Sequence, residues 1–178
     1  MLASQLEILD QGRLYLQSIS ESEYTAIVSP NFISSAGAHM RHIIDHYLAL
    51  MDGLNTETVD YDIRRRGGII ESNPKAAIKE IEKISNWIKR LSETDLNKNI
   101  TLSTEISITQ KTTQTFRTSI ARELIFAGSH AVHHYAMIAQ IAFSQKICVP
   151  EFFGIAPTTA TFLRGQESQN LNSAFSSS

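Results

Sequence analysis

Apolar residues recur with the spacing of an α-helix in four stretches of the chain. The first stretch covers residues 2–22, where Gly12 is a mild weakness in an otherwise regular pattern. The apolar positions are Leu2, Leu6, Leu9, Leu16 and Ile19. The segment Val28-Ser29-Pro30-Asn31 then has the composition of a turn, so the first helix is predicted to end before it.

The second and third helices are predicted at residues 35–54 and 74–91. Ser34 or Ser35 can cap the second helix through its side-chain oxygen. The pair Asn73-Pro74 opens the third helix, because proline is well tolerated at the first helical position. The apolar positions of the third helix are Ile78, Ile81, Ile84 or Ser85, Ile88 and Leu91. Residues 55–73 show no clean period, and we expect a long surface loop there.

The second half of the chain begins with a change of residue types. Residues 99–118 are mostly β-branched or aromatic, which predicts two short strands in a hairpin. Ser119 can cap a long helix that continues to about Lys146 and is ended by Pro150. A short final helix is expected after that. Residues 167–178 are rich in Ser and Asn and are predicted to be a disordered tail, which leaves residues 1–166 as a single domain.

Length and charge narrow the class of protein. The chain has 178 residues, enough for one full core and too few for two comfortable ones. A formal net charge of −2 gives no general attraction to nucleic acid or to anionic membranes. The first 20 residues lack the apolar core of a signal peptide, and the one cysteine, Cys148, has no partner for an internal disulfide. These features favour a soluble, cytoplasmic protein.

All six histidines fall in two of the predicted helices: His39, His42 and His46 in one, and His130, His133 and His134 in the other. The first three span an arc of about 60° and share one helical face. His130 and His134 lie one turn apart, so their ring nitrogens can converge on one cation. Confining every histidine to two helical faces is hard to explain by packing, and metal binding is the favoured interpretation.

A metal site in a helical bundle is built from side chains that face each other across the interior. The geometry allows His42 to meet His130 and His134, and we predict these three as metal ligands. Three neutral imidazoles suit Zn²⁺, Ni²⁺, Cu²⁺ or Fe²⁺, with Zn²⁺ or Ni²⁺ preferred, and they leave a coordination position for water or substrate. Such an open site is competent for chemistry.

Further residues are candidates for supporting roles. For His46 and His39 three roles are open: an additional metal ligand, a partner that orients a ligand, or a proton carrier. Together with Glu123, these two histidines are the candidate catalytic residues. Glu123 shares a helical stripe with His130 but lies about 10 Å along the axis, where it can flank a pocket. His133 lies off this stripe, and a role without metal is favoured for it.

Arginines are the candidate residues for binding a cofactor. Arg64, Arg65, Arg66 and Arg122 can hold carboxylates of an anionic cofactor through paired hydrogen bonds, although a solvated loop face is favoured for the first three. Several other chemistries lack their motif. The sequence has no Glu-x-x-His pair of a di-iron bundle, no zincin glutamate and no glycine-rich phosphate loop.

The residues around the histidines resemble those of the DinB/YfiT-like metalloenzyme family, and the similarity covers nearly the whole chain. Residues 34–50, SSAGAHMRHIIDHYLAL, are similar to the second-helix signature of the family, in which His42 takes the ligand position. Residues 129–134, SHAVHH, are similar to its His-x-x-His-His segment, whose first and last histidines bind the metal. Many members continue with Arg-Gly-Gln, where this chain has Tyr135-Ala136-Met137.

The resemblance implies an all-α protein, an up-down-down-up four-helix bundle that is often dimeric and holds a divalent ion at one end. Characterised relatives in this family include thiol S-transferases that use bacillithiol or mycothiol, and a mycothiol-dependent maleylpyruvate isomerase. The leading hypothesis is therefore a metal-dependent thiol S-transferase with a small-molecule substrate, expected to be a homodimer. The alternatives are a metal-dependent hydrolase and a metal-binding or stress-linked bundle without chemistry. Nucleic-acid binding is not expected, because no basic helix face is present.

Overall fold

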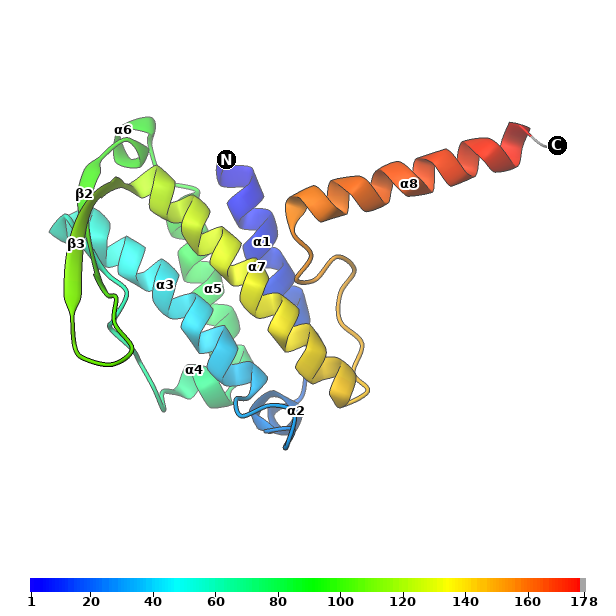
Figure 1. Ribbon diagram of the computed structural model, residues 1–178, viewed down its shortest axis with the longest axis horizontal. Coiled ribbons are helices and arrows are strands. Elements are labelled where there is room, and N and C mark those ends of the chain that lie inside the picture. The colour runs from blue at the N-terminus through cyan, green and yellow to red at the C-terminus, as the bar shows by residue number, and fades with distance from the viewer. Residues whose placement is uncertain (177–178) are drawn as a thin grey trace.

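Four helices lie side by side and enclose the core of the protein (Figure 1). They are α1 (Leu2–Ser18), α3 (Ala36–Thr56), α5 (Pro74–Ile88) and α7 (Ile120–Ser144). Helix α1 contacts α5 and α7, and α3 contacts the same two helices, so each member has two neighbours. This computed structural model describes the backbone of residues 1–176 and the side chains of residues 1–166.

The starts of three of these helices are set by local chemistry, as predicted. The Ser35 hydroxyl accepts a hydrogen bond from the Ala38 N–H, at 3.2 Å, and begins α3. Asn73 caps α5 through the Ala76 N–H, at 2.9 Å, with Pro74 as the first helical residue. Ser119 caps α7 in the same manner. Each side chain satisfies an amide that has no partner within its own helix.

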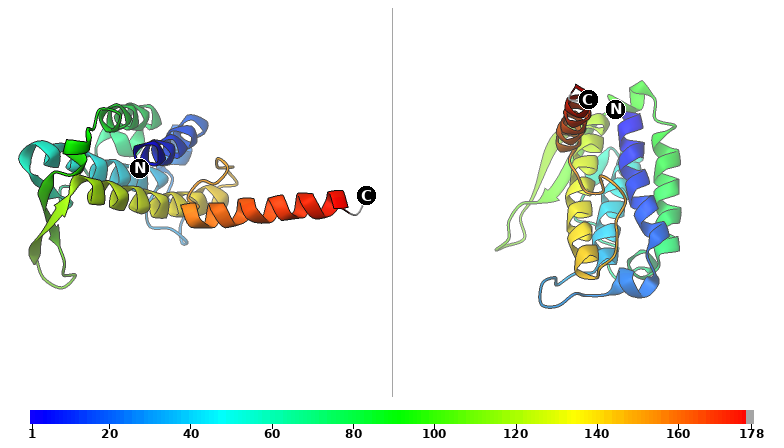
Figure 2. Two further views of the ribbon diagram at one scale, coloured as in Figure 1. Left: turned by 90° about the horizontal axis from the view of Figure 1, so that it is seen from above. Right: turned by 90° about the vertical axis from the view of Figure 1, so that its right-hand side faces the viewer.

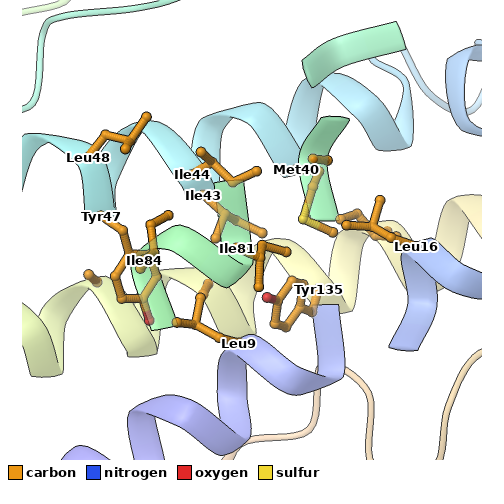
Figure 3. Packing of buried hydrophobic residues seen from close by; sticks show 14 of the residues in the cluster. Leu9, Leu16, Met40, Ile43, Ile44, Tyr47, Leu48, Ile81, Ile84 and Tyr135 are labelled. Carbon is orange, nitrogen blue, oxygen red and sulfur yellow. The ribbon is translucent and has the colours of Figure 1, made fainter. Parts of the chain in front are cut away.

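The core is formed by apolar side chains from all four helices (Figure 3). The fully buried members include Leu9 and Leu16 of α1, Met40, Ile43 and Tyr47 of α3, Ile81 and Ile84 of α5, and Tyr135 of α7. The Tyr135 ring lies against Gly12, where a Cβ atom would collide with the phenol oxygen. The glycine that weakens the helical pattern of α1 is therefore required for the packing of α7.

The first helix is shorter than predicted. Helix α1 ends at Ser18, and a separate helix, α2 (Glu21–Thr25), follows it. Ser20 and Glu23 form a reciprocal capping box, in which each side chain accepts a hydrogen bond from the other residue's backbone. This Ser-x-x-Glu signature starts a new helix within the predicted range 2–22 and explains the error.

A small sheet lies at one end of the helices, with the strand order β1-β2-β3. Strands β2 (Asn99–Glu105) and β3 (Thr113–Ser119) form the antiparallel hairpin that the sequence predicted. Strand β1 (Thr58–Asp60) pairs with β2 in parallel and lies in the predicted loop 55–73, as does the short helix α4 (Ile69–Ser72). A further short helix, α6 (Glu93–Leu96), precedes β2. Three residues are too few to show the alternation of a strand, which is why β1 was missed.

The final helix, α8 (Pro157–Ser176), has 20 residues and corrects the expectation of a short one. It extends away from the four central helices (Figures 1 and 2). The Ser-rich and Asn-rich end of the chain has no periodic apolar pattern, which is why a long helix was not predicted there. The predicted disordered tail, 167–178, has helical backbone to Ser176, while its side chains and residues 177–178 lie outside the described residues. Within the described part, no helix has the length and apolar character needed to cross a bilayer.

Candidate metal centre

Helices α3 and α7 pack against each other and bring the two groups of histidines together. The Nε2 atom of His130 lies 3.0 Å from Nε2 of His42 and 3.1 Å from Nε2 of His134. The three predicted ligands therefore meet at one place between the helices. His42 comes from one helix, and the other two come from successive turns of its neighbour.

Two of the nitrogen separations among the predicted ligands suit a divalent cation. Two nitrogen atoms that each lie about 2.0–2.1 Å from one ion, at about 90–110° to each other, are roughly 2.8–3.4 Å apart. The two separations around His130 fall in that range. A second set of three, His42, His46 and His130, has ligand atoms within 4.8 Å of one another. Both sets share His42 and His130, so the third position is open to His46 or His134.

Hydrogen bonds orient the rings that surround this pair. The Nδ1 atoms of His39 and His134 lie 2.9 Å apart, which turns Nε2 of His134 toward His130. The Nδ1–H of His46 donates to the His42 carbonyl at 3.0 Å. A carbonyl can only accept, so in the neutral His46 ring the proton is on Nδ1 and the Nε2 lone pair is free for a metal or a proton.

Aromatic side chains form a wall beside the histidines. The His46 ring stacks on Tyr61, with centroids 4.7 Å apart, and the His130 ring stacks on Phe126 at 5.7 Å. Burial, reinforced by Glu123, raises the pKa of Tyr61 above its ordinary value, so this phenol stays protonated. It donates its hydrogen bond to Glu123 at 2.8 Å. Tyr61 was not singled out from the sequence, because its segment has no period.

Glu123, a predicted catalytic residue, is fully buried. Its oxygens accept hydrogen bonds from the Tyr61 hydroxyl at 2.8 Å, the Thr118 hydroxyl at 2.7 Å and the Arg122 guanidinium at 2.6 Å. Three donors engage the carboxylate, which links β3, the β1–α4 segment and α7 through one side chain. A catalytic role for Glu123 stays a prediction, and what the structure shows is that it fixes Tyr61.

The four predicted arginines lie in different surroundings. Arg64 is half-buried and contacts the ring of His42. Arg65 pairs with Asp45 and Asp52, and Arg66 is exposed. Arg122 pairs with Glu123, and its guanidinium lies 5.4 Å from the centroid of the Phe126 ring. Of these side chains, Arg64 is the one in direct contact with the histidine cluster.

Two other findings concern residues near the site. His133 is exposed, and its ring centroid is 6.4 Å from that of His130, which agrees with its position off the stripe. Asp45, which sequence reasoning missed, is buried and binds Arg41 one helical turn earlier at 3.1 Å. An Arg-x-x-x-Asp pair in a predicted helix was the signal that could have identified it.

The surroundings of the cluster keep its rings neutral. Burial lowers the pKa of His42 to about 2, that of His134 to about 3 and that of His130 to about 4, and neighbouring histidines add to each shift. Burial also lowers the pKa of His39 and His46. Neutral imidazole is the form that binds a metal ion, so the site is in its ligating state at neutral pH.

These shifts predict that the metal-free protein loses stability in mild acid. In the unfolded chain the histidines bind protons as the pH falls through about 6.5, while in the folded chain they stay neutral to about pH 4 or below. The unfolded state therefore binds more protons than the folded state in this range. As a result, the free energy of unfolding decreases as the pH is lowered. Urea unfolding with a chelator at about pH 7.5, 6.5 and 5.5 measures the slope, which should be flatter in His42→Ala/His130→Ala/His134→Ala. An equal pH dependence in the wild type and the triple variant would show that these three histidines are not the cause of the acid sensitivity.

Among the comparisons with known proteins, a solved structure supports this picture of the fold. No family model matches the chain. FK506-binding protein 5 of Rhizopus delemar is 34% identical over 108 residues, which is 61% of this chain and 28% of that protein. The chain thus spans little more than a quarter of the length of that curated relative. Among solved structures, YjoA, a DinB-like protein of Bacillus subtilis, matches with a TM-score of 0.63 and 14% identity, covering 85% of this chain and 96% of that one. At this identity the match shows the fold, which is DinB-like.

Proposed function

We propose that this chain is a metal-dependent enzyme that acts on small molecules with a thiol cofactor, as a bacillithiol-type S-transferase does. The observation that carries the proposal is the convergence of the His42, His130 and His134 nitrogens, with separations of 3.0 and 3.1 Å around His130. The DinB-like fold supports it, since the sequence resemblance to that family implies metal ligands at His42, His130 and His134. Zn²⁺ or Ni²⁺ is the proposed ion, because both accept three imidazole ligands.

The residues around the ion divide into holding and proton-carrying groups. His42 and His130 would hold the ion together with His134 or His46. A divalent ion in this position supplies a positive charge that lowers the pKa of a bound thiol or water, so that a nucleophile exists near neutral pH. His39 orients His134 through its Nδ1 contact, and Tyr61 holds the His46 ring by stacking.

Of His46 and His134, the ring that does not bind the metal is the proposed proton acceptor. If His134 is the third ligand, His46 has a free Nε2 lone pair that can accept the thiol proton. If His46 is the third ligand, His134 and His39 form a pair of rings through which the proton can leave. In both cases Tyr61 and Phe126 place an apolar surface beside the reacting group.

The ring of contacts among α1, α3, α5 and α7 supports an up-down-down-up four-helix bundle. We also propose that the protein is a homodimer, as the resemblance implies, and that it is cytoplasmic, as the composition implies. The proposed metal site needs no partner chain, because every candidate ligand belongs to one and the same chain.

The proposal predicts that protein purified without a histidine tag carries about one Zn²⁺ or Ni²⁺ per chain. Metal analysis by mass spectrometry measures this value. His42→Ala/His130→Ala/His134→Ala should retain under about a tenth of it, because two shared ligands and a third are lost. His133→Ala is the matched control, since it removes an exposed histidine from the same helix. Equal metal content in the triple variant and the wild type would exclude this site.

The reaction is tested with the same proteins after metal loading. Incubation with bacillithiol and the electrophile monochlorobimane should give a conjugation rate well above that of the triple variant. Rates equal to those of the variant would rule out the transferase. Turnover without added thiol would instead select the metal-dependent hydrolase, and bound metal without turnover would select a binding protein.

A further inference from the structure

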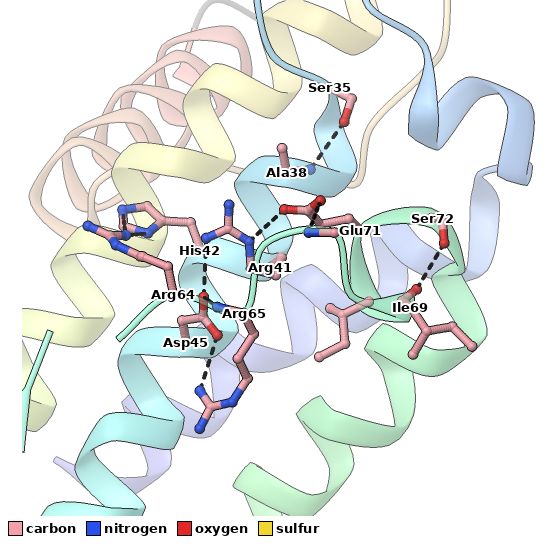
Figure 4. A network of polar contacts seen from close by, with 12 residues as sticks. Ser35, Ala38, Arg41, His42, Asp45, Arg64, Arg65, Ile69, Glu71 and Ser72 are labelled. Carbon is pink, nitrogen blue, oxygen red and sulfur yellow. Dashed lines mark hydrogen bonds and ion pairs between the residues drawn. The ribbon is translucent and has the colours of Figure 1, made fainter. Parts of the chain in front are cut away.

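Ion pairs to two buried side chains of α3, Arg41 and Asp45, fasten the segment between β1 and α4 to that helix (Figure 4). Asp45, with its side chain 2% exposed, accepts hydrogen bonds from the guanidinium groups of Arg41 (3.1 Å) and Arg65 (3.2 Å) and from the Arg65 N–H (3.2 Å). Glu71 accepts from Arg41 at 2.8 Å and from the Gly67 N–H at 2.9 Å. The backbone that follows Arg64 is therefore held in place.

The backbone that precedes Arg64 is also anchored. The Tyr61 N–H donates to the Ser103 carbonyl at 3.4 Å, and the Tyr61 hydroxyl donates to Glu123 at 2.8 Å. Residue 64 thus lies between two fixed points, one on the sheet and one on α3. Its position next to the histidines is a property of the folded segment and not of a free loop.

The Arg64 side chain points from this anchored segment to the histidine cluster. Its Nη1 atom contacts Nδ1 of His42 and lies 3.3 Å from Nε2 of the same ring. None of the ion pairs formed by the side chains of residues 1–166 includes Arg64. Its neighbour Arg65, by contrast, is paired with Asp45 and Asp52.

A half-buried guanidinium beside a site for a divalent cation places two positive charges close together. The two charges repel each other unless an anion lies between them. A guanidinium also presents its N–H donors in a planar fork that matches the two oxygens of a carboxylate. The arrangement therefore calls for a ligand with one negative group next to the atom that reaches the ion.

We propose that Arg64 binds the carboxylate of a small acidic thiol whose sulfur faces the histidine cluster. This inference rests on the proposed function and specifies the class of thiol that the site takes. On binding, the guanidinium exchanges its contact with His42 for the carboxylate, and no covalent bond changes. A carboxylate suits the site better than a phosphate, because Arg65 is committed to Asp45 and Asp52 and only Arg64 faces the ring.

The test compares two thiols that differ in one group, N-acetylcysteine and its uncharged amide. Calorimetric titration into zinc-loaded protein should show the acid binding about tenfold more tightly than the amide. This ratio should fall to about one in Arg64→Ala and be intermediate in Arg64→Lys, which keeps the charge without the fork. Arg66→Ala is the matched control, because it removes an exposed arginine two residues away and should keep the full ratio.

The inference is overturned if the wild type binds neither thiol, if it binds both equally, or if the preference persists in Arg64→Ala. Zinc content is measured before each titration, which separates two kinds of failure. A chain that takes up no zinc contradicts the proposed function. A chain that is fully loaded but shows no preference for the acid contradicts only the role of Arg64.

Discussion

Replacing Asp45 with alanine is expected to lower the free energy of unfolding by about 3–5 kcal/mol. The Asp45 side chain is 2% exposed, and its oxygens bind Arg41, the Arg65 side chain and the Arg65 N–H. Arg41 has its side chain 9% exposed and would lose one of its two carboxylate partners. Removing one partner of a buried ion pair costs far more than the intact pair contributes, because the remaining charge of Arg41 is then only partly compensated, by Glu71. Urea unfolding followed by circular dichroism measures the loss.

Asp52→Ala provides the control for this variant. Asp52 lies on the same helix and also pairs with Arg65, at 3.6 Å, but its side chain is 68% exposed. Exposed ion pairs contribute about 0–1 kcal/mol, so this change should leave the free energy of unfolding within about 1 kcal/mol of the wild type. Losses of the same size in both variants would mean that burial of Asp45 is not the cause.

Helix starts could be predicted from the sequence because the signals are local. Ser35, Asn73 and Ser119 each accept a hydrogen bond from an amide three residues ahead, and that interaction needs no partner from elsewhere in the chain. The same is true of His130 and His134, whose spacing alone places them on one face. Their approach to His42 followed from the expectation that two apolar helices pack together.

The sequence predicts His134 as the third metal ligand, and the structure adds His46 as a second candidate, which depends on contacts between distant segments. His46 is positioned by Tyr61, which belongs to a segment without periodic pattern, and His134 by His39 on another helix. Strand β1 could not be predicted from the sequence either, because it too depends on a distant part of the chain. Val59 is fully buried and pairs with Leu102, more than 40 residues away, so its environment is set by a partner that three residues cannot specify.

The anchoring contacts show how the fold prepares the site from outside. Asp45 and Glu123 both hold the segment that carries Tyr61 and Arg64, one from α3 and the other from α7. The hydrogen bonds of both carboxylates go to other groups than the histidine rings, yet each carboxylate fixes a segment that touches those rings. Changes at either position should therefore act on stability first and on metal binding through the segment between β1 and α4.

Glu123→Ala is the second change with a large expected effect, a loss of about 3 kcal/mol in the free energy of unfolding. The fully buried carboxylate accepts three hydrogen bonds, and its removal leaves a cavity and the hydroxyls of Tyr61 and Thr118 without their acceptor. Thr118→Val removes one of the donors at constant size and should cost about 1 kcal/mol. Chemical unfolding of both variants tests this, and a loss below about 1 kcal/mol in Glu123→Ala would contradict it.

The same variant distinguishes the two sets of metal ligands. Glu123 holds Tyr61 by a hydrogen bond, and the Tyr61 ring stacks on that of His46 with centroids 4.7 Å apart. Among the described residues, Tyr61 makes no ring contact with His134. If His46 binds the ion, Glu123→Ala should weaken zinc affinity by about tenfold or more, as the loss of an orienting partner does. If His134 binds it, the affinity should stay near that of the wild type, while His39→Ala should weaken it, because His39 orients His134. Competition with a chromogenic chelator measures both affinities, and equal affinities in the wild type and the two variants would show that neither contact orients a ligand.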